Sequence, residues 1–259
     1  MANMNEEAKK QYKNKKFFFK IIRGTIKIFY RKRKFIGVEN IPSSPCFFVG
    51  NHAQLHGPLA SEIFFPRKKA IWCIGQMMKI KEVPGYAYQD FWSYKPKYIR
   101  WFFKIVSYII APISAYVFTN ADTIGVYKDA RIITTFKETV KRLEQGCDII
   151  IFPEKEEEFN NIVNEFQDKF VDAARLYARK NNKSISFVPM YNAAKIKTIV
   201  FGKPIEFDVN MNMDEQRVKI VNYLKEEITR IALELPPHKV VPYLNVGSKN
   251  YKYSREKSK

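Results

Sequence analysis

Short apolar runs separated by longer amphipathic stretches make up most of this chain. The apolar runs end at glycine, proline or polar turn residues, which is typical of buried strands. They cover residues 47–49, 70–74, 124–127, 148–154, 186–190 and 198–206. The stretches between them predict helices over 59–65, 129–145, 161–179 and 214–235, most with apolar residues at steps of three and four. Because strands that alternate with helices form parallel sheets through crossovers, we expect an α/β fold with a twisted, mostly parallel sheet flanked by helices.

Two segments mix aromatic residues with basic or apolar neighbours and do not fit this alternation. In residues 15–34, Phe and Ile are threaded between Lys and Arg, and no uncharged run is long enough to span a bilayer. This composition indicates an interfacial helix in the membrane headgroups, and the alternative is a helix packed on its own domain with a solvated basic edge. Residues 84–118 are rich in Tyr and Trp and then apolar around Pro112. They indicate a second membrane-facing or acyl-lining element, with a buried core helix as the alternative.

The net charge of +19 is concentrated near the start of the chain. Twelve Lys and Arg residues lie between Lys9 and Lys34 without an acidic residue among them, which leaves +7 for the remainder. Such an arm favours a polyanionic partner, and nucleic acid ranks below an anionic membrane surface because no nucleic-acid motif accompanies it. The three cysteines have no metal-binding spacing, and their odd number argues against a disulfide framework. We therefore expect the protein to reside in the reducing cytosol, with its cysteines as free thiols.

Candidate chemistry begins where the first apolar run ends. Residues 47–49 stop at Gly50, and Asn51 and His52 follow at once. This places His52 at the mouth of a strand-to-helix turn, where open α/β sheets hold their reactive groups. His52 is a candidate general base, and a structural histidine satisfied by hydrogen bonds is the alternative.

Several blocks along the chain resemble those of the glycerolipid acyltransferases, the family of 1-acyl-glycerol-3-phosphate acyltransferases. The family has Asn-His-x4-Asp, Gly-x-Ile-x-x-x-Arg, Phe-Pro-Glu-Gly-Thr-Arg and Val-Pro blocks. The corresponding residues are Asn51 and His52, the region Gly125–Arg131, Phe152, Pro153 and Glu154, and then Val188 and Pro189. The resemblance spans about residues 40 to 208. It implies that His52 is the general base in acyl transfer from a thioester to an alcohol, that the other matched residues surround the acceptor, and that neither a metal nor a bound cofactor is required.

The first block departs from the family pattern at the position of its acid. Gly57 stands five residues after His52, where the family has the Asp that orients the base. In Ser-His-Asp hydrolases, loss of the orienting carboxylate costs about 10⁴ in turnover. His56 lies one residue out of register. The carboxylates that remain as candidates for this role are Glu154, Glu156, Glu157 and Asp129.

The third block departs at its basic end. Lys155, Glu156 and Glu157 replace Gly-Thr-Arg, and that Arg is implied to grip the acceptor's phosphate. An acidic run there favours a neutral, sugar-like or cationic acceptor over a phosphomonoester, and a solvated acidic face is the alternative. Lys128 is the preferred match to the family's other basic residue and Arg131 the second choice. Lys128 or Arg131 would bind the phosphate of the acceptor or the diphosphate of the acyl donor. The alternative is that each is an ordinary basic residue exposed to solvent.

A zinc site is the remaining interpretation of the histidines. His52 and His56 have a spacing that binds zinc on a helix, but Ala53 stands where the zinc-protease motif needs Glu. The third imidazole, His238, is far away in sequence. We expect no metal site.

Taken in order, these features predict a basic membrane-facing arm over 1–40, an acyltransferase-like domain over 41–245 with the aromatic insertion 84–118, and a flexible basic tail over 246–259. They predict a peripheral or monotopic enzyme at the cytoplasmic face of the cell membrane. It would move a fatty acyl group from acyl-CoA or acyl-carrier protein to a hydroxyl of a lysophospholipid or lipid-like acceptor. The alternative, favoured by Gly57 and the 155–157 substitution, is a lipid-binding protein that kept the fold and lost turnover.

Overall fold

The computed structural model describes residues 6–93 and 95–255, which form two compact units. Unit 1 contains Met1–Arg31 and Trp72–Thr135, and unit 2 contains Lys32–Ile71 and Phe136–Lys259. This division differs from the predicted boundaries at residues 40 and 84–118. The inserted segment is longer than expected and begins within a strand. Each unit is described in turn.

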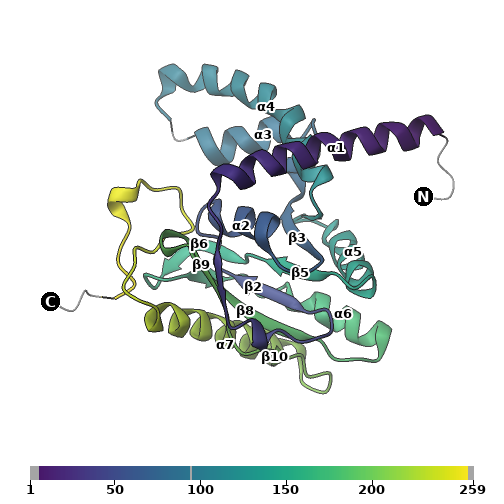
Figure 1. Cartoon of the computed structure of the whole chain (residues 1–259), viewed down its shortest axis with the longest axis vertical. Coiled ribbons are helices and arrows are strands. Elements are labelled where there is room, and N and C mark those ends of the chain that lie inside the picture. Colours follow the sequence, from purple (N-terminus) through teal and green to yellow (C-terminus); the bar gives the residue numbers. More distant parts are fainter. Residues whose placement is uncertain (1–5, 94, 256–259) are drawn as a thin grey trace. The chain divides into compact units, whose positions relative to one another are not determined.

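Unit 2 is built on the sheet that the sequence predicts (Figure 1). Its central strand β2 (Phe47–Gly50) pairs in parallel with β5 (Asp148–Ile151) and with β8 (Ser186–Ala193), and β5 pairs in parallel with the first half of β3 (Lys69–Ile74). Beyond β8 the direction reverses, because β9 (Thr198–Phe201) is antiparallel to β8 and β1 (Lys34–Ile36) runs parallel to β9. The short β10 (Ile205–Glu206) also pairs antiparallel with β8. The predicted α/β fold with a mostly parallel sheet is confirmed.

Continuous apolar sequence explains why these strands are central. Phe47, Phe48 and Val49 are fully buried, as are Ile149 and Ile150 opposite them. Parallel strands that are covered on both faces have this unbroken apolar pattern. The Phe47 ring stacks on Phe187 of β8 with centroids 4.9 Å apart. The register brings the carboxyl ends of β2, β5 and β8 to one edge of the sheet, since Val49 lies opposite both Ile151 and Pro189.

Helices of the predicted type connect and cover the strands of unit 2. They are α2 (His56–Phe64), α5 (Ile132–Glu144), which crosses from unit 1, α6 (Val171–Asn181) and α7 (Met213–Glu234). The long helix α7 packs along β8, and α6 packs against α7 (Figure 1). The Asn212 side chain caps α7 by accepting a hydrogen bond from Asp214 N–H at 2.9 Å. Three short 3₁₀ turns complete the unit: η1 (Val38–Asn40), η5 (Ala194–Ile196) and η6 (Ser248–Asn250).

The helix predicted over 161–179 is wrong in its first half. Residues there form a hairpin of β6 (Glu154–Phe159) and β7 (Asn164–Phe166), and α6 begins only at Val171. The Asn160 side chain accepts hydrogen bonds from Ile162 N–H at 3.0 Å and Val163 N–H at 2.9 Å. Asn side chains that satisfy nearby N–H groups in this way stabilise turns in competition with helices. The apolar residues do recur at helical spacing, but the first of them, Val163 and Phe166, lie in the turn and in strand β7.

Unit 1 is mainly helical. It contains α1 (Glu6–Phe29), η2 (Gly75–Met78), α3 (Val83–Ala87), η3 (Tyr88–Trp92), η4 (Lys97–Ile99), α4 (Arg100–Asn120) and β4 (Thr123–Val126). Helix α4 packs against α3 through a small core of Val83, Ala87 and Ala111 and also contacts α1. It continues through Pro112, so the apolar part of the predicted segment 84–118 lies within one helix that extends to Asn120. The helical character predicted for residues 15–34 is present from residue 6 to residue 29.

Candidate functional site

The candidate site lies in unit 2, where β2 ends, and Asn51 fixes that end. Its side-chain Oδ1 accepts a hydrogen bond from Asn192 N–H at 2.7 Å, and its Nδ2 donates to Asn192 O at 3.3 Å. Asn51 is buried, and this side-chain contact joins the chain after β2 to β8 just beyond the paired residues Gly50 and Met190. Both polar atoms of Asn51 are therefore engaged by the sheet, which gives the residue a structural role, and its contact with a substrate stays a prediction.

The chain then makes a tight, strained turn into α2. Ala53 and Gln54 both have positive φ, at 46° and 54°. His56 N–H donates to Ala53 O at 3.0 Å, and Gly57 N–H donates to His52 O at 2.9 Å. Non-glycine residues in left-handed conformations cost of order 1–3 kcal/mol each and persist only where neighbouring structure holds them. Two in succession beside His52 therefore need an external support.

That support comes from residues 236–255, which we call the C-terminal strap. Gln54 N–H donates to Pro242 O at 3.1 Å, and its side-chain Nε2 donates to Leu244 O at 3.2 Å and Val246 O at 3.0 Å. Its Oε1 accepts from the Tyr251 hydroxyl at 3.1 Å. Gln54 thus ties the turn to the strap through both its backbone and its side chain.

The strap is folded back on itself, which corrects the prediction of a separate flexible tail from residue 246. Val240 N–H donates to Lys252 O at 2.8 Å, Ser254 N–H donates to His238 O at 2.9 Å, and Lys239 and Tyr253 form a β-bridge. Residues 246–255 are therefore part of unit 2, and residues 256–259 of the predicted tail lie outside the described residues. The sequence pattern concealed this because the stabilising contacts join the strap to residues nearly 200 positions earlier.

A buried Tyr–His pair anchors the strap to the sheet. The Tyr191 hydroxyl of β8 lies 2.8 Å from His238 Nε2, and His238 Nδ1 lies 2.8 Å from Pro236 O. Because a carbonyl only accepts, Nδ1 carries the proton and Nε2 accepts from Tyr191. Burial lowers the pKa of His238 and raises that of Tyr191. His238 is thus a structural histidine.

The His52 ring sits between two aromatic side chains. Phe152 lies edge-on with ring centroids 5.6 Å apart, and Tyr243 of the strap lies edge-on at 5.4 Å. Burial lowers the pKa of His52 from 6.5 to about 4, and the backbone of Gln54 opposes this shift in part. Nδ1 is buried and has no hydrogen-bond partner among the described residues. His52 is therefore a neutral imidazole at physiological pH, and no carboxylate among the described side chains bonds to its Nδ1.

Glu154 holds the backbone of this turn and does not contact the ring nitrogen. Its Oε2 accepts from His52 N–H at 2.6 Å, and its Oε1 accepts from Asn164 N–H at 3.0 Å. The residue is only 3% exposed, and burial raises its pKa to about 7, although both backbone N–H groups oppose the shift. Glu154 therefore positions His52 through the main chain, joining β2 to the β6–β7 hairpin.

The structure explains why Gly occupies position 57. A Cβ there would lie 2.7 Å from the carbonyl oxygens of Asn51 and His52 and 2.8 Å from a ring carbon of Phe152. Real Cβ atoms essentially never come this close to backbone, so the turn in its present form excludes the family's Asp. The conformation of the turn therefore requires glycine at position 57, where the family has Asp.

Two predicted phosphate-binding residues, Lys128 and Arg131, belong to unit 1. The Arg131 guanidinium pairs with Asp129 at 2.7 Å and with Glu82 at 3.3 Å, and it stacks over Tyr127 at 4.1 Å from the ring centroid. Arg131 is therefore held by neighbours of its own unit, and Asp129, a candidate for orienting His52, is Arg131's partner. Lys128 is exposed at the end of β4.

The remaining members of the predicted blocks have identifiable places in unit 2. Pro153 O accepts from Gln167 N–H at 2.8 Å, and Pro189 O accepts from Gly202 N–H at 2.8 Å, so both prolines serve the fold. Lys155 is half-buried, with its carbonyl bound by the Asn164 side chain, and Glu156 is exposed. The side chain of Glu157 lies outside the described residues.

Sequence reasoning did not identify the strap residues or Gln54. Nothing local marks them, because Tyr243, Gln54 and Asn192 act through contacts between distant segments. The nearest hint in the sequence is the pair Pro236 and Pro237, which ends α7 and redirects the chain. Among the residues that the structure describes, no cluster of three or more His, Cys, Asp or Glu side chains could hold a metal ion.

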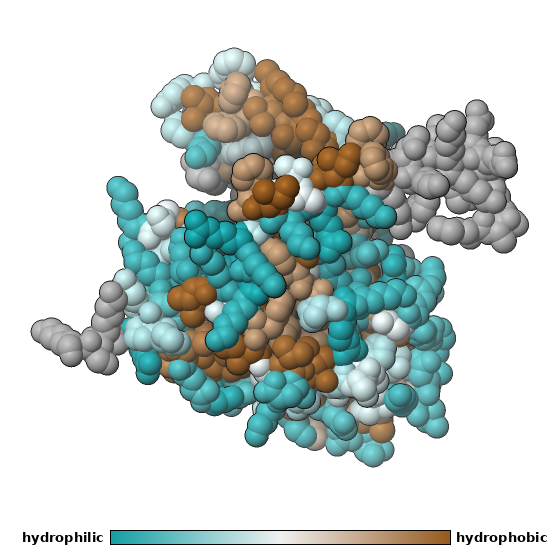
Figure 2. Space-filling view, viewed as in Figure 1, coloured by the Kyte–Doolittle hydropathy of each residue, from teal (hydrophilic) through white to brown (hydrophobic). Residues whose placement is uncertain are grey.

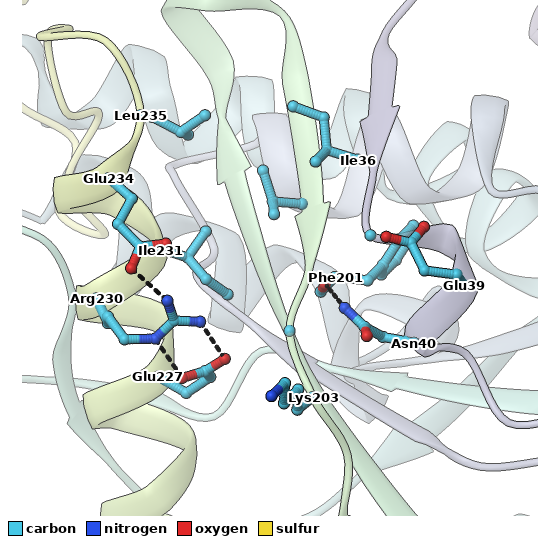
Figure 3. A pocket seen from close by; sticks show the side chains of 13 residues that line it. Ile36, Glu39, Asn40, Phe201, Lys203, Glu227, Arg230, Ile231, Glu234 and Leu235 are labelled. Atoms are coloured by element: carbon cyan, nitrogen blue, oxygen red, sulfur yellow. Dashed lines mark hydrogen bonds and ion pairs between the residues drawn. The ribbon is translucent and has the colours of Figure 1, made fainter.

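A shallow cavity of about 340 Å³ lies elsewhere on unit 2, between α7, β9 and the β1–η1 segment (Figure 3). Ion pairs line one wall, where Arg230 donates to Glu227 at 2.7 Å and also pairs with Glu234. The Asn40 side chain donates to Phe201 O at 2.9 Å on the opposite wall. None of the residues that contact His52 lines this cavity, and we assign it no role.

In unit 1, α4 presents large apolar side chains to solvent. Its small residues Ser107, Ala111 and Ala115 are buried, whereas Trp101 is 65% exposed. Figure 2 shows apolar side chains gathered along α4. The exposed set is Trp101, Phe102, Ile105, Tyr108, Ile109 and Ile113. Within the described residues, the segment Lys97–Asn120 is long and apolar enough to cross a membrane, as judged by length and composition. This arrangement contradicts the alternative of a buried core helix.

The fold has a solved counterpart. Over 90% of this chain and 85% of the other, the structure superposes on the crystal structure of the 1-acyl-sn-glycerophosphate (LPA) acyltransferase PlsC from Thermotoga maritima, with a TM-score of 0.50 and 14% sequence identity. No protein-family model matches the sequence, and no curated protein matches it. The likeness is one of architecture: this chain has an acyltransferase-like fold.

Proposed function

We propose that this protein is a membrane-associated O-acyltransferase. It would move a fatty acyl group from acyl-CoA or acyl-carrier protein to a hydroxyl of a lysophospholipid or lipid-like acceptor. The observation that carries the proposal is the position of His52. A neutral imidazole at the carboxyl end of a central strand, within an acyltransferase-like fold, is placed where such sheets hold their reactive groups.

In the proposed reaction, His52 takes the proton of the acceptor hydroxyl as the oxygen attacks the thioester carbonyl. A C–O bond forms, and the resulting oxyanion collapses with cleavage of the C–S bond. The imidazolium then returns its proton to the departing thiolate. General-base catalysis of this kind contributes about 10²–10⁴ in rate. No metal or bound cofactor enters these steps, and the acyl thioester is a co-substrate.

The buried environment of His52 determines how readily this imidazole accepts a proton in the proposed reaction. A pKa of about 4 means that the imidazole is unprotonated, and so available as a base, at neutral pH. The same burial disfavours the imidazolium by about 3 kcal/mol relative to an exposed histidine. Without a carboxylate on Nδ1, the charge of a bound substrate or the developing oxyanion must offset that cost. The proposal therefore predicts a slow enzyme.

Membrane attachment is part of the proposal. The exposed apolar face of α4 would enter the interface, and the basic residues near the start of the chain would meet anionic headgroups. The apolar face and the basic residues would act together, because the membrane affinity of an interfacial helix rises with both its buried apolar area and its attraction to anionic lipids. We place the protein at the cytoplasmic face of the cell membrane, as a peripheral or monotopic protein.

The acceptor proposal follows from the block at residues 155–157. An acidic residue, Glu157, replaces the Arg implied to bind a phosphomonoester, and the neighbouring Glu156 is exposed on strand β6 of the hairpin. Like charge would repel a doubly charged acceptor. A neutral, sugar-like or cationic acceptor is therefore favoured over a phosphomonoester.

A second function is favoured by two specific observations: position 57 has no room for a side chain, and His52 Nδ1 has no partner within the described residues. A lipid-binding protein that kept the fold and lost turnover would tolerate both. It would still bind membranes through α4.

An acceptor panel separates the two functions. Labelled acyl-CoA and acyl-carrier protein would be offered with lysophospholipids, monoacylglycerol, glycolipids and sterol-like alcohols on anionic vesicles, and the products identified by mass spectrometry. The enzyme predicts an acylated product with an uncharged or sugar-bearing acceptor, and none with the His52→Ala variant. Intact vesicle binding without any product above that variant would replace the enzyme with the lipid-binding protein.

A further inference from the structure

The His52 imidazole needs a support other than an acid if it is to act as a base. In Ser-His-Asp systems a carboxylate holds the catalytic histidine in its working orientation. Here the turn excludes a side chain at position 57, and both oxygens of Glu154 accept from backbone N–H groups. Displacement of a catalytic group by about 1 Å can cost about 10²-fold in rate. Another part of the chain must therefore hold the ring.

The C-terminal strap reaches the His52 turn and the His52 ring through two consecutive residues. Pro242 O accepts from Gln54 N–H at 3.1 Å, and the next residue, Tyr243, lies edge-on to the imidazole with ring centroids 5.4 Å apart. Phe152 makes the second edge-on contact, at 5.6 Å. Edge-to-face contacts of this kind have a preferred geometry, so they restrict the tilt of the ring. The strap supplies one of these two contacts.

The Gln54 side chain fixes the strap against this turn with all of its polar atoms. Its Nε2 donates to Leu244 O at 3.2 Å and Val246 O at 3.0 Å, and its Oε1 accepts from the Tyr251 hydroxyl at 3.1 Å. Only an amide offers two N–H donors and a carbonyl acceptor in this arrangement. Gln54 is also left-handed, with φ 54°, a conformation that persists where neighbouring structure holds it. Its backbone acts on the ring as well, since it opposes the lowering of the pKa of His52 by burial.

The strap is itself fixed to the sheet at other points. Tyr191 of β8 bonds to His238 at 2.8 Å, and Val240 N–H donates to Lys252 O at 2.8 Å. Neither contact involves Gln54. A series of contacts therefore runs from β8 through the strap to His52, and its last members can be removed while these anchors remain.

We propose that Gln54 and Tyr243 are positioning residues, through which the C-terminal strap holds the His52 imidazole in place of an orienting acid. The strap supplies orientation without charge, because residues 236–255 contain no Asp or Glu. It therefore keeps the ring in place and leaves it a neutral base. That this orientation serves acyl transfer rests on the proposed function, whereas the hold on the ring does not.

The test measures the pKa of His52 in the full-length protein by NMR titration of its isotope-labelled histidines, of which the chain has three. The His52→Ala variant assigns the signal. Gln54→Met keeps the length of the side chain and removes its three hydrogen bonds, and Tyr243→Ala removes the ring contact. The matched controls are Gln167→Met, at an exposed glutamine, and Tyr223→Ala, at a half-buried tyrosine of α7. Thermal melts verify that each variant is folded.

Release of the ring lets water reach it, so the pKa of His52 should rise from about 4 toward 6.5 in Gln54→Met and in Tyr243→Ala. Both controls should leave this pKa at about 4. In acyl transfer, the two variants should lower kcat about 10- to 100-fold with little change in KM. The acid limb of kcat/KM should move up in pH together with the pKa of His52.

The proposal fails if the pKa of His52 stays at about 4 in folded Gln54→Met and Tyr243→Ala, or if it rises equally in the controls. It also fails if both variants keep the kcat of the controls. Acyl transfer by the unmodified protein with an unmoved pKa in the variants would overturn the positioning role alone. A pKa that rises in the variants of a protein that transfers no acyl group would overturn the proposed enzyme and leave the hold on His52 standing.

Discussion

Placing a methyl group at position 57 is the sharpest test of how the turn is built. In Gly57→Ala the new Cβ would meet two backbone carbonyl oxygens at 2.7 Å and the Phe152 ring at 2.8 Å. Overpacking of this kind costs about 1–3 kcal/mol. For a domain of this size each kcal/mol lowers the melting temperature by about 2–4 °C. We therefore expect Gly57→Ala to melt roughly 3–10 °C below the unmodified protein, and Gly57→Asp lower still.

Circular dichroism melts measure this, with Gly85→Ala as the control. Gly85 lies in α3, and no atom lies within 4 Å of a Cβ built there. Alanine favours a helix over glycine, so this control should melt at or slightly above the starting temperature. The reasoning is refuted if Gly57→Ala melts with the unmodified protein. It is refuted equally if Gly57→Asp folds normally and transfers acyl groups faster, because the turn would then accept the family's acid.

Three further predictions follow from the same contacts. The acid limb of kcat/KM should fall near pH 4, because protonation removes the base only below the pKa of His52; a limb near pH 6.5 would show an exposed imidazole. For Glu154, whose folded pKa of about 7 exceeds the unfolded value of 4.5, the stabilising contribution is complete below pH 4.5 and is lost as pH rises through about 7. Glu154→Gln should remove a fall of about 2 kcal/mol in the free energy of unfolding between pH 5.5 and pH 8.5, measured by urea unfolding, and an unchanged pH dependence would contradict the assignment. Replacing Trp101 and Phe102 with serine should weaken binding to anionic vesicles at least about tenfold in a flotation assay, since each buried aromatic contributes about 1.5–3 kcal/mol; equal binding would exclude α4 as the attachment face.

Local patterns in the sequence predicted most of the sheet. Buried parallel strands leave a direct mark, because both faces must be apolar, and residues 47–49 and 148–151 have that mark. The position of His52 followed from the same reasoning, since the end of such a strand is set by the first polar residue. The apolar spacing gave a wrong prediction after Asn160. The side chain of this residue bonds to the backbone N–H groups of Ile162 and Val163 and stabilises a hairpin turn where a helix was predicted.

The surroundings of His52 could not be predicted in this way. Glu154 was expected among the substrate contacts, yet its oxygens bind the backbone of residues 102 positions earlier and 10 positions later. Gln54 has no distinctive neighbours in sequence, and only the folded strap gives its side chain three partners and its backbone N–H a fourth. Such roles depend on contacts between distant segments, for which composition and periodicity carry no information.

Acyl transfer by the unmodified protein and by His52→Ala, measured side by side with labelled acyl donor and anionic vesicles that contain the acceptor, tests the central claim most directly. If His52 is the general base, kcat/KM should fall about 10²–10⁴-fold in the variant, while its melting temperature and vesicle binding stay unchanged. Transfer at the same rate in a folded His52→Ala protein would contradict the account.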